Sequence, residues 1–293
     1  MIRAASTQGN ARRSPLALCL LCLGGCTSDY EFSKPSVDPN DVTECGFTRV
    51  EDTDFYRYDC NPVFSSTGED WAATIDATAF YVTTVLGHPF YQLWYSGFQD
   101  VDVYGDYGLG YAVSSEGTTW ETHRSNPVLE EPGESDWDAD SMDAMRVIWD
   151  PGTEQYVMLY QGINFDSNTW GLGVATSAAG HSWNRLPSNP VMDLSTSTGV
   201  VTNWCWPMGL GLGEVAGFSG YVAGTRGIGN ACEIHALGGS SVSSWTPTDQ
   251  LVLAAGSVGD FDEKGFVSMD IATLGDTRYL FYAGFGEWVT QPG

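Results

Sequence analysis

The stretch that decides the fold runs from Trp137 to Val191 and reads WDADSMDAMRVIWDPGTEQYVMLYQGINFDSNTWGLGVATSAAGHSWNRLPSNPV. Three segments in it are rich in β-branched and aromatic residues and are separated by turn-forming residues, which predicts strands. The predicted strands are Met145–Asp150, Gln155–Gly162 and Trp170–Ser177. A glycine-containing turn then leads to Trp183, and the unit ends in Asn-Pro-Val.

Weaker copies of this unit lie on both sides of it. The tripeptide Asn-Pro-Val begins at Asn61, Asn126 and Asn189, which are 65 and 63 residues apart. The aromatic strand recurs at three places, the last of them degenerate: Tyr91–Gly97, Tyr279–Gly284 and Gly220–Gly224. The chain is therefore an internal repeat with a period of about sixty residues.

A tryptophan follows the turn in three of the copies. These residues are Trp120, Trp183 and Trp245, which are 63 and 62 residues apart. Large aromatic side chains at repeat positions usually pack in the core. We predict that these tryptophans fill the space between neighbouring units and are not platforms for sugars.

A repeat of this length with about four strands per unit is typical of a β-propeller. One small twisted sheet cannot bury both of its faces, so neighbouring sheets stack around an axis. We therefore expect an all-β fold, a β-propeller of four-stranded blades. Four blades' worth of strands are visible in the sequence.

The N-terminal segment is expected to close this ring. The fourth unit stops after its second strand, near Gly284, while Gly46–Cys60 precedes the first Asn-Pro-Val at the spacing of outer strands. Phe55 stands six residues before Asn61, as Trp120 stands six residues before Asn126. Completing the last blade in this way would cover exposed sheet edges.

Composition limits the partners of this protein. Among 293 residues, 12 are Lys or Arg and 37 are Asp or Glu, which gives a net charge of −25. Nucleic-acid binding requires clustered basic residues, so we exclude it. The acidic surface favours solubility outside the cell, and it also suits the binding of cations or of neutral polar ligands such as sugars.

The N-terminus has the organisation of a bacterial lipoprotein signal. Arg12 and Arg13 precede an apolar run, and Leu23-Gly24-Gly25-Cys26 resembles a lipobox, whose cysteine is lipidated and becomes the mature N-terminus. An ordinary signal peptide with a chance cysteine is the alternative. We predict a signal peptide at residues 1–25, palmitate-type lipid on Cys26, a tether at 26–43 and the propeller domain at 44–293. Thr27 after the cysteine favours the outer membrane, on its periplasmic or surface face.

The cysteines outside the signal segment indicate disulfide bonds. Cys45, Cys60, Cys205 and Cys232 form an even set in a predicted oxidising compartment. Three pairings are possible, and the local choice is Cys45–Cys60 with Cys205–Cys232. None of them has the close spacing that zinc sites prefer.

The combined motifs resemble the five-bladed propeller glycoside hydrolases. The motifs are Asn-Pro-Val, Tyr-x-x-x-Tyr-x-Gly, Gly-x-Gly-x-Ala-x-Ser and Ser-x-x-Gly-x-x-Trp, and the families are the arabinanases and xylosidases of family 43, the fructosidases of family 32 and the mannoside phosphorylases of family 130. The resemblance spans roughly residues 45–290. It implies a carbohydrate partner and paired-carboxylate cleavage of a glycosidic bond. A truncated chain, a degenerate blade or a four-bladed relative would each explain the count of four.

The resemblance also implies acids on the innermost strands, around the central channel. We expect Asp76, Asp143 and Asp270 to be catalytic, and Arg146, Trp206 and Glu233 to contact substrate. Family motifs such as Trp-Met-Asn-Asp-Pro, Arg-Asp-Pro and Glu-Cys are not clearly present, and Cys232-Glu233 has the last order reversed. A non-catalytic propeller that binds glycan or protein is therefore the alternative, and the enzyme class stays open.

Two further acidic clusters are candidates for calcium by ligand type alone. They are Asp138, Asp140 and Asp143 in the second unit, and Asp100, Asp102 and Asp106 in a loop. Solvated loop acids are the simpler interpretation, so we expect no cofactor, with calcium as the exception. We expect a monomer that meets the membrane only through its lipid. The acids of the second unit, together with Arg146, form a group that the other units do not repeat.

Overall fold

The computed structural model describes residues 32–33, 45–51, 56–65, 74–98, 107–130, 132–194, 203–204, 210–213, 218–225, 231–241, 243–274 and 277–286. Every regular element within these ranges is a β-strand. A search of the same residues found no helix with the length and apolarity needed to cross a membrane. The predicted signal peptide and Cys26 lie outside the described residues.

The first two blades are built in the same way. Blade 1 contains β4 to β8. Its third strand, β6, pairs with the two short outer strands β7 and β8. Blade 2 contains β9 to β13 in the same order. The strand bounds are β4 Thr74–Val85, β5 His88–Phe98, β6 Tyr107–Ser114, β7 Glu121–His123, β8 Leu129–Glu130, β9 Ser141–Asp150, β10 Gln155–Asn164, β11 Thr169–Ser177, β12 Asn184–Arg185 and β13 Met192–Asp193. A further two-residue strand, β1 (Phe32–Ser33), pairs with β7.

The remaining strands form two more blades and a separate hairpin. Blade 3 contains β14 to β18, blade 4 contains β19 and β20, and β2 pairs with β3. Their bounds are β14 Asn203–Trp204, β15 Leu210–Gly213, β16 Phe218–Thr225, β17 Glu233–Ser241, β18 Ser244–Leu253, β19 Gly265–Leu274, β20 Thr277–Phe285, β2 Phe47–Arg49 and β3 Tyr56–Tyr58.

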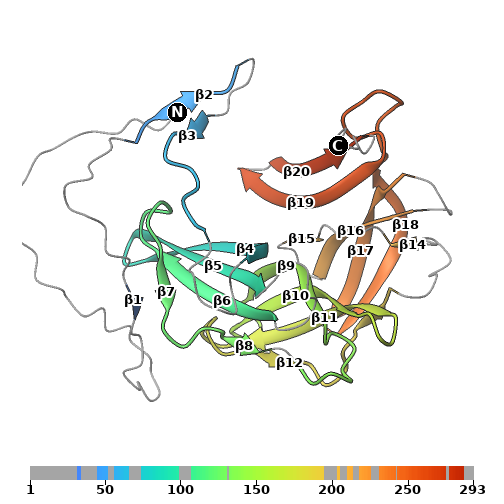
Figure 1. Cartoon of the computed structure of the whole chain (residues 1–293), viewed down its shortest axis with the longest axis horizontal. Helices are drawn as coiled ribbons and strands as arrows, with labels where there is room; N and C mark the ends of the chain where they lie inside the picture. The colour runs from blue at the N-terminus through green and yellow to red at the C-terminus, as the bar shows by residue number, and fades with distance from the viewer. Residues whose placement is uncertain are drawn as a thin grey trace, which may run out of the picture. The chain divides into compact units, whose positions relative to one another are not determined.

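The sheets are arranged as a four-bladed propeller, as the repeat predicts (Figure 1). The innermost strands are β4, β9, β15 and β19: β9 lies beside β4 and β15, and β15 lies beside β19. The three strands predicted in the second unit correspond to β9, β10 and β11. The expected all-β propeller is thus confirmed.

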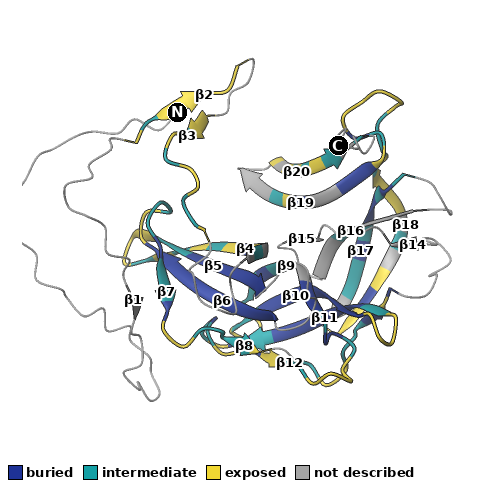
Figure 2. Ribbon diagram, viewed as in Figure 1, coloured by how far each residue is buried: buried dark blue, intermediate teal, exposed yellow. Residues whose placement is uncertain are grey.

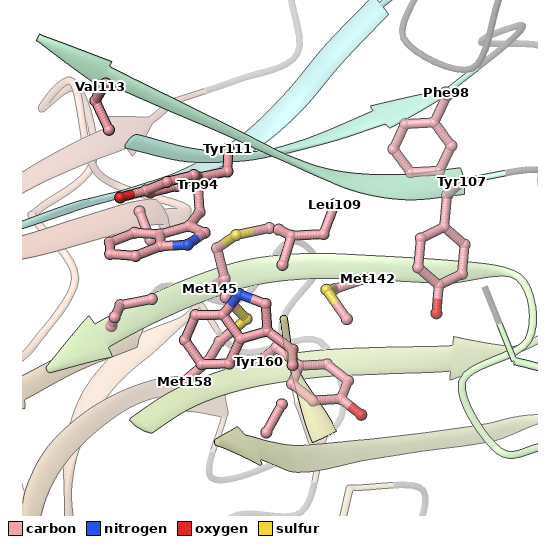
Figure 3. Packing of buried hydrophobic residues seen from close by; sticks show 14 residues of the cluster. Trp94, Phe98, Tyr107, Leu109, Tyr111, Val113, Met142, Met145, Met158 and Tyr160 are labelled. Carbon is pink, nitrogen blue, oxygen red and sulfur yellow. The ribbon is translucent and has the colours of Figure 1, made fainter. Parts of the chain in front are cut away.

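The core lies between the blades. Figure 2 shows buried residues along β5, β6, β10 and β11, because both faces of these strands are covered. Trp94 and Tyr111 of blade 1 pack in one cluster with Met145, Met158 and Tyr160 of blade 2 (Figure 3). The predicted burial of the repeat tryptophans is confirmed, since all three are at most 7% exposed: Trp120, Trp183 and Trp245.

One backbone carbonyl joins the indoles of two neighbouring blades. The Nε1 atoms of Trp94 and Trp183 both donate to the oxygen of Gly180, at 2.6 and 2.9 Å. The two rings lie 5.9 Å apart and nearly perpendicular. Both polar indole atoms are therefore satisfied inside the core, which removes the cost of burying them unpaired.

The Asn-Pro-Val tripeptide ties the outer turn of a blade to its second strand. The Asn126 side-chain amide donates to the Tyr95 hydroxyl at 3.0 Å, and Asn189 donates to Tyr160 at 3.3 Å. All three Asn–Pro peptide bonds are cis. The repeat motif thus has a structural role in the blades where it is described.

The N-terminal segment has only part of its expected structure. It contains β2 and β3, which pair with each other, and a disulfide joins Cys45 to Cys60 as predicted. Among the described residues, the strand ladders join this hairpin to no other sheet. Its place in the last blade stays a prediction.

Candidate functional site

The innermost strands carry the predicted acids close to a bulge. The pairing of β4 shifts between Ile75 and Thr78, and the pairing of β9 shifts between Asp143 and Arg146. A bulge re-aims the side chains next to it and is common beside active sites. Asp76 lies within the first of these bulges, and Asp143 stands at the edge of the second.

Asp76 and Asp143 occupy the same position in their blades. Each stands two residues before a residue whose carbonyl accepts a bond from Arg146, which is Thr78 in β4 and Met145 in β9. The side chains of both acids lie outside what the structure describes, so only their place on the strand is known.

Arg146 connects the innermost strands of three blades. Its Nη1 atom donates to the carbonyls of Thr78 and Met145 at 3.4 and 2.7 Å, and its Nη2 atom donates to the carbonyl of Met269 in β19. Its Nε atom lies 3.2 Å from a carboxylate oxygen of Asp270. One guanidinium thus links β4, β9 and β19 at the axis.

Burial and charge act on this arginine in opposite directions. The Arg146 side chain is only 18% exposed, whereas that of Asp270 is 64% exposed. Burial lowers the pKa of Arg146, and the neighbouring Asp270 carboxylate opposes that shift. Because the guanidinium remains charged at neutral pH, it offsets the negative charge of the neighbouring Asp270 carboxylate.

The structure brings two of the predicted site residues into direct contact. Arg146 and Asp270 stand at equivalent positions, opposite Leu159 and Phe281 of the second strands. Because the carbonyls of Thr78 and Met145 both accept from Arg146, the strand positions of Asp76 and Asp143, two residues earlier, lie near the same guanidinium. We use the name axial cluster for the following strand positions: Asp76, Asp143, Arg146, Met269 and Asp270.

Asp138 belongs to the scaffold and not to this cluster. It is 1% exposed, and its carboxylate accepts bonds from the Tyr160 hydroxyl at 2.8 Å and from Arg185 Nε at 3.1 Å. Burial raises its pKa, and Arg185 and Tyr160 oppose that shift. Blade 4 repeats the arrangement, with the Tyr282 hydroxyl 3.1 Å from Asp262. Asp138 thus has a counterpart in blade 4, although the structure does not test whether the whole group of acids with Arg146 is repeated.

The other predicted residues lie elsewhere or are not described. Glu233 begins β17, the strand between β16 and β18, and its carboxylate is 3.7 Å from the ring of His235. Asp140 accepts a bond from the backbone of Phe165 at 2.6 Å, which holds a loop. Trp206 lies outside the described residues.

The structure also bears on the expected metals and disulfides. Within the described ranges, no group of three or more His, Cys, Asp or Glu side chains is placed to hold a metal ion. The loop acids Asp100, Asp102 and Asp106 lie outside those ranges. Cys232 is disulfide-bonded, and its predicted partner Cys205 is not described.

Sequence reasoning missed the residues that surround Asp138. Arg185 bonds to Asp138, to the Tyr107 hydroxyl at 3.3 Å and to the carbonyl of Glu130 at 3.0 Å. Arg185 lies four residues before Asn189, a position that holds Thr122 in blade 1. Aligning the repeats therefore shows that Arg185 replaces the threonine of blade 1. It does not show that Arg185 bonds to Asp138, which is 47 residues away in the sequence.

Comparison with known proteins supports the fold. No protein-family model matches this chain, and no curated protein matches it. Among solved structures, a glycoside hydrolase is 18% identical, with a TM-score of 0.51. The match covers 70% of this chain and only 60% of that protein, so this chain spans less than two thirds of it.

Two further structures match over more of their length. A putative glycoside hydrolase from Parabacteroides distasonis is 17% identical over 82% of this chain and 72% of its own, with a TM-score of 0.53. A structure from the GH130 family of mannoside phosphorylases, described as containing hydrolases that target β-1,2 mannosidic linkages in Candida mannan, is 17% identical over 86% and 73%, with a TM-score of 0.52. At these identities the likeness shows the fold alone: this chain has the propeller fold found in these glycoside hydrolases.

Proposed function

We propose that this protein acts on carbohydrate through a glycoside-hydrolase-like site at the propeller axis. The observation that carries the proposal is that one guanidinium, that of Arg146, bonds to the innermost strands of three blades. Those strands carry Asp76, Asp143 and Asp270. Acids contributed by several strands to one axis supply the pair of carboxyl groups that glycosidic cleavage requires.

The proposed roles follow from position and charge. Asp76 and Asp143 stand at equivalent strand positions next to bulges, so they are the candidates for the two working carboxyl groups. Asp270 is already paired with Arg146 at 3.2 Å, so its carboxylate is held in place beside the axis. We assign it to orienting Arg146 and setting the local charge, because its carboxylate is already engaged by the guanidinium.

The test is a screen of the purified protein on aryl glycosides and on arabinan- and mannan-type polymers. If Asp143 is one of the two working groups, Asp143→Asn lowers kcat/KM by about 100-fold or more. Asp166→Asn is the matched control, because Asp166 is an exposed loop acid in the same blade. If Asp143→Asn turns over substrate as fast as the unmodified protein, the assignment of this site is wrong.

A glycan- or protein-binding propeller is the second candidate. It is favoured by the bonds already made by Arg146, because they engage the guanidinium with the protein's own carbonyls and with Asp270. Binding to a glycan array without turnover of any substrate, with binding lost in Asp143→Asn, supports this candidate over the enzyme.

The same proposal includes a lipid anchor at Cys26 and an outer-membrane location. Its support is the basic, apolar and Leu-Gly-Gly-Cys order of residues 1–26. Mass spectrometry of the N-terminal peptide after bacterial expression tests it. An acylated peptide beginning at Cys26, absent in Cys26→Ala, is expected, and an unmodified peptide cut elsewhere contradicts it.

A further inference from the structure

The hairpin β2–β3 corresponds to the outer half of a blade. In blades 1 and 2 the third strand meets the fourth at Ala112 opposite Thr122 and at Ala175 opposite Arg185. Both fourth-strand residues lie four positions before the Asn of Asn-Pro-Val. In the hairpin, the residue four positions before Asn61 is Arg57, and it pairs with Thr48. Strand β2 is therefore equivalent to β6 and β11, and β3 to β7 and β12.

Blade 4 contains the inner half of a blade. Phe261 stacks on Tyr282 at 5.9 Å, and the Tyr282 hydroxyl bonds to Asp262. Trp137 stacks on Tyr160 at 5.7 Å in the same way in blade 2. Strands β19 and β20 are thus the first and second strands, and the hairpin supplies the third and fourth.

We propose that β2 docks on the edge of β20 opposite β19, in one defined register. In blade 1 Tyr95 lies opposite Gly110, and in blade 2 Tyr160 lies opposite Gly173. By equivalence, Tyr282 lies opposite Gly46, and Leu280 lies opposite Thr48. Spacing alone indicates that this segment belongs to the last blade. The strand pairings of blades 1 and 2 show further that β2 is the strand that docks, that it docks on the edge of β20 opposite β19, and which residues lie opposite each other.

The glycine is required at this position because the tyrosine ring covers the backbone. A Cβ atom built on Gly110 would lie 2.1 Å from the Tyr95 ring, and one built on Gly173 would lie 2.5 Å from the Tyr160 ring. Gly46 occupies the same place, two residues before Thr48. Its backbone can therefore pass over the ring of Tyr282 as its counterparts do.

The Asn-Pro-Val motif supplies a second bond in this register. Asn126 and Asn189 each donate to the hydroxyl of the second-strand tyrosine of their own blade. In the docked hairpin, the amide of Asn61 donates to the Tyr282 hydroxyl. Its turn already has the geometry of the other two: Asn61 donates from its backbone to Tyr58, as Asn126 does to His123.

Docking also covers aromatic side chains that are now exposed. Phe47 is 67% exposed and Phe281 is 45% exposed. The proposed register sets them opposite each other, where blade 1 has Tyr111 and Trp94 with ring centroids 5.4 Å apart. Burying two such rings removes apolar surface from water and favours the docked state.

The first experiment is hydrogen exchange of the full chain followed by peptide mass spectrometry over β20. The β20 amides are expected to be protected in the unmodified protein, and Gly46→Ala is expected to raise their exchange rate at least tenfold. Gly133→Ala is the matched control, since the nearest atom to a Cβ there is 3.6 Å away. Protection of β3 in Gly46→Ala shows that the hairpin itself still folds.

Two results of this experiment overturn the proposal. One is rapid exchange of β20 in the unmodified protein, because the edge is then uncovered. The other is protection that Gly46→Ala does not change, because another segment or a second copy of the chain then covers the edge.

A pair of engineered cysteines tests the register directly. Thr48→Cys with Leu280→Cys is expected to form a disulfide within the monomer, because directly opposite Cβ atoms lie close enough to bridge. Thr48→Cys with Leu253→Cys, which places the second cysteine in blade 3, is expected to form none. A bridge found only in dimers, or equal bridging in both variants, overturns the proposal.

Discussion

Gly173 lies where the backbone of β11 crosses the ring of Tyr160, and this residue carries a stability prediction. A Cβ atom there would lie 2.5 Å from the Tyr160 ring and 2.8 Å from Trp137. Both rings are packed, so neither can move cheaply. Gly173→Ala is expected to lower the free energy of unfolding by about 1–3 kcal/mol, measured by urea denaturation. Gly133→Ala is the control, and equal losses in the two variants contradict the argument.

The stacked histidines His123 and His181 predict a dependence of stability on pH. Their rings lie 5.0 Å apart, beside Tyr111. Burial lowers the pKa of both histidines, and for His123 the charges of His181 and Arg124 lower it further. The unfolded chain therefore binds more protons than the folded chain below the ordinary pKa of 6.5. The free energy of unfolding falls as pH drops from about 6.5 towards 5.

Urea denaturation between pH 5 and pH 8 measures this effect. The double variant His123→Gln/His181→Gln is expected to flatten the slope below pH 6.5, and His88→Gln serves as a control on the exposed end of β5. A slope that the double variant leaves unchanged assigns the pH dependence to other groups.

At the residue scale, repeat positions were predictable and pairwise contacts were not. The burial of Trp183 follows from its period, and the equivalence of Arg146 with Asp270 follows from aligned units. That these two residues touch does not follow, because strands of different blades meet only in the folded ring. Asp138 has the sequence context of a site residue, yet its partners, Tyr160 and Arg185, make it part of the scaffold.

At the scale of elements, Arg146 is a brace between strands as well as a proposed substrate contact. Its bonds to Thr78, Met269 and Asp270 join β4, β9 and β19. Arg146→Met is expected to lower the free energy of unfolding by about 2–4 kcal/mol, because the buried carbonyls lose their donor. Arg146→Lys keeps the charge but cannot bond in three directions, so an intermediate loss is expected.

Chemical denaturation checks this prediction, with Arg57→Met on the exposed face of the hairpin as the control. The control is expected to stay within about 0.5 kcal/mol of the unmodified protein. An Arg146→Met variant as stable as the control would leave this arginine with no bracing role, and only its substrate contact would remain to be tested.

The strands themselves were predictable, and their irregularities were not. β-Branched and aromatic residues and turn signals indicate β10 and β11 to within two residues, but they miss the first four residues of β9, which begins at Ser141 and not at Met145. The bulges in β4 and β9 have no such signal, because the ladder shift depends on the partner strand as well as on the strand itself. These bulges set the places of Asp76 and Asp143, so candidate acids can be named from sequence but their convergence cannot.

At the scale of the whole molecule, the excess of acidic residues produces charge repulsion. A net charge of −25 opposes the compact state, and salt screens that repulsion. Raising NaCl from about 10 mM to about 300 mM is expected to raise Tm by about 2–5 °C in scanning calorimetry. CaCl2 at matched ionic strength is expected to give a similar rise. A much larger rise with calcium, reversed by a chelator, would instead reveal a bound ion among the acidic loops.

The shared carbonyl of Gly180 has an optical consequence. Because it fixes the indoles of Trp94 and Trp183 at 5.9 Å and nearly at right angles, their electronic transitions are held in one chiral geometry. Such a pair of chromophores couples and gives an exciton couplet in circular dichroism. Among the described residues this pair lies at the boundary between blades 1 and 2, so the intensity of its couplet during unfolding would report when those two blades part.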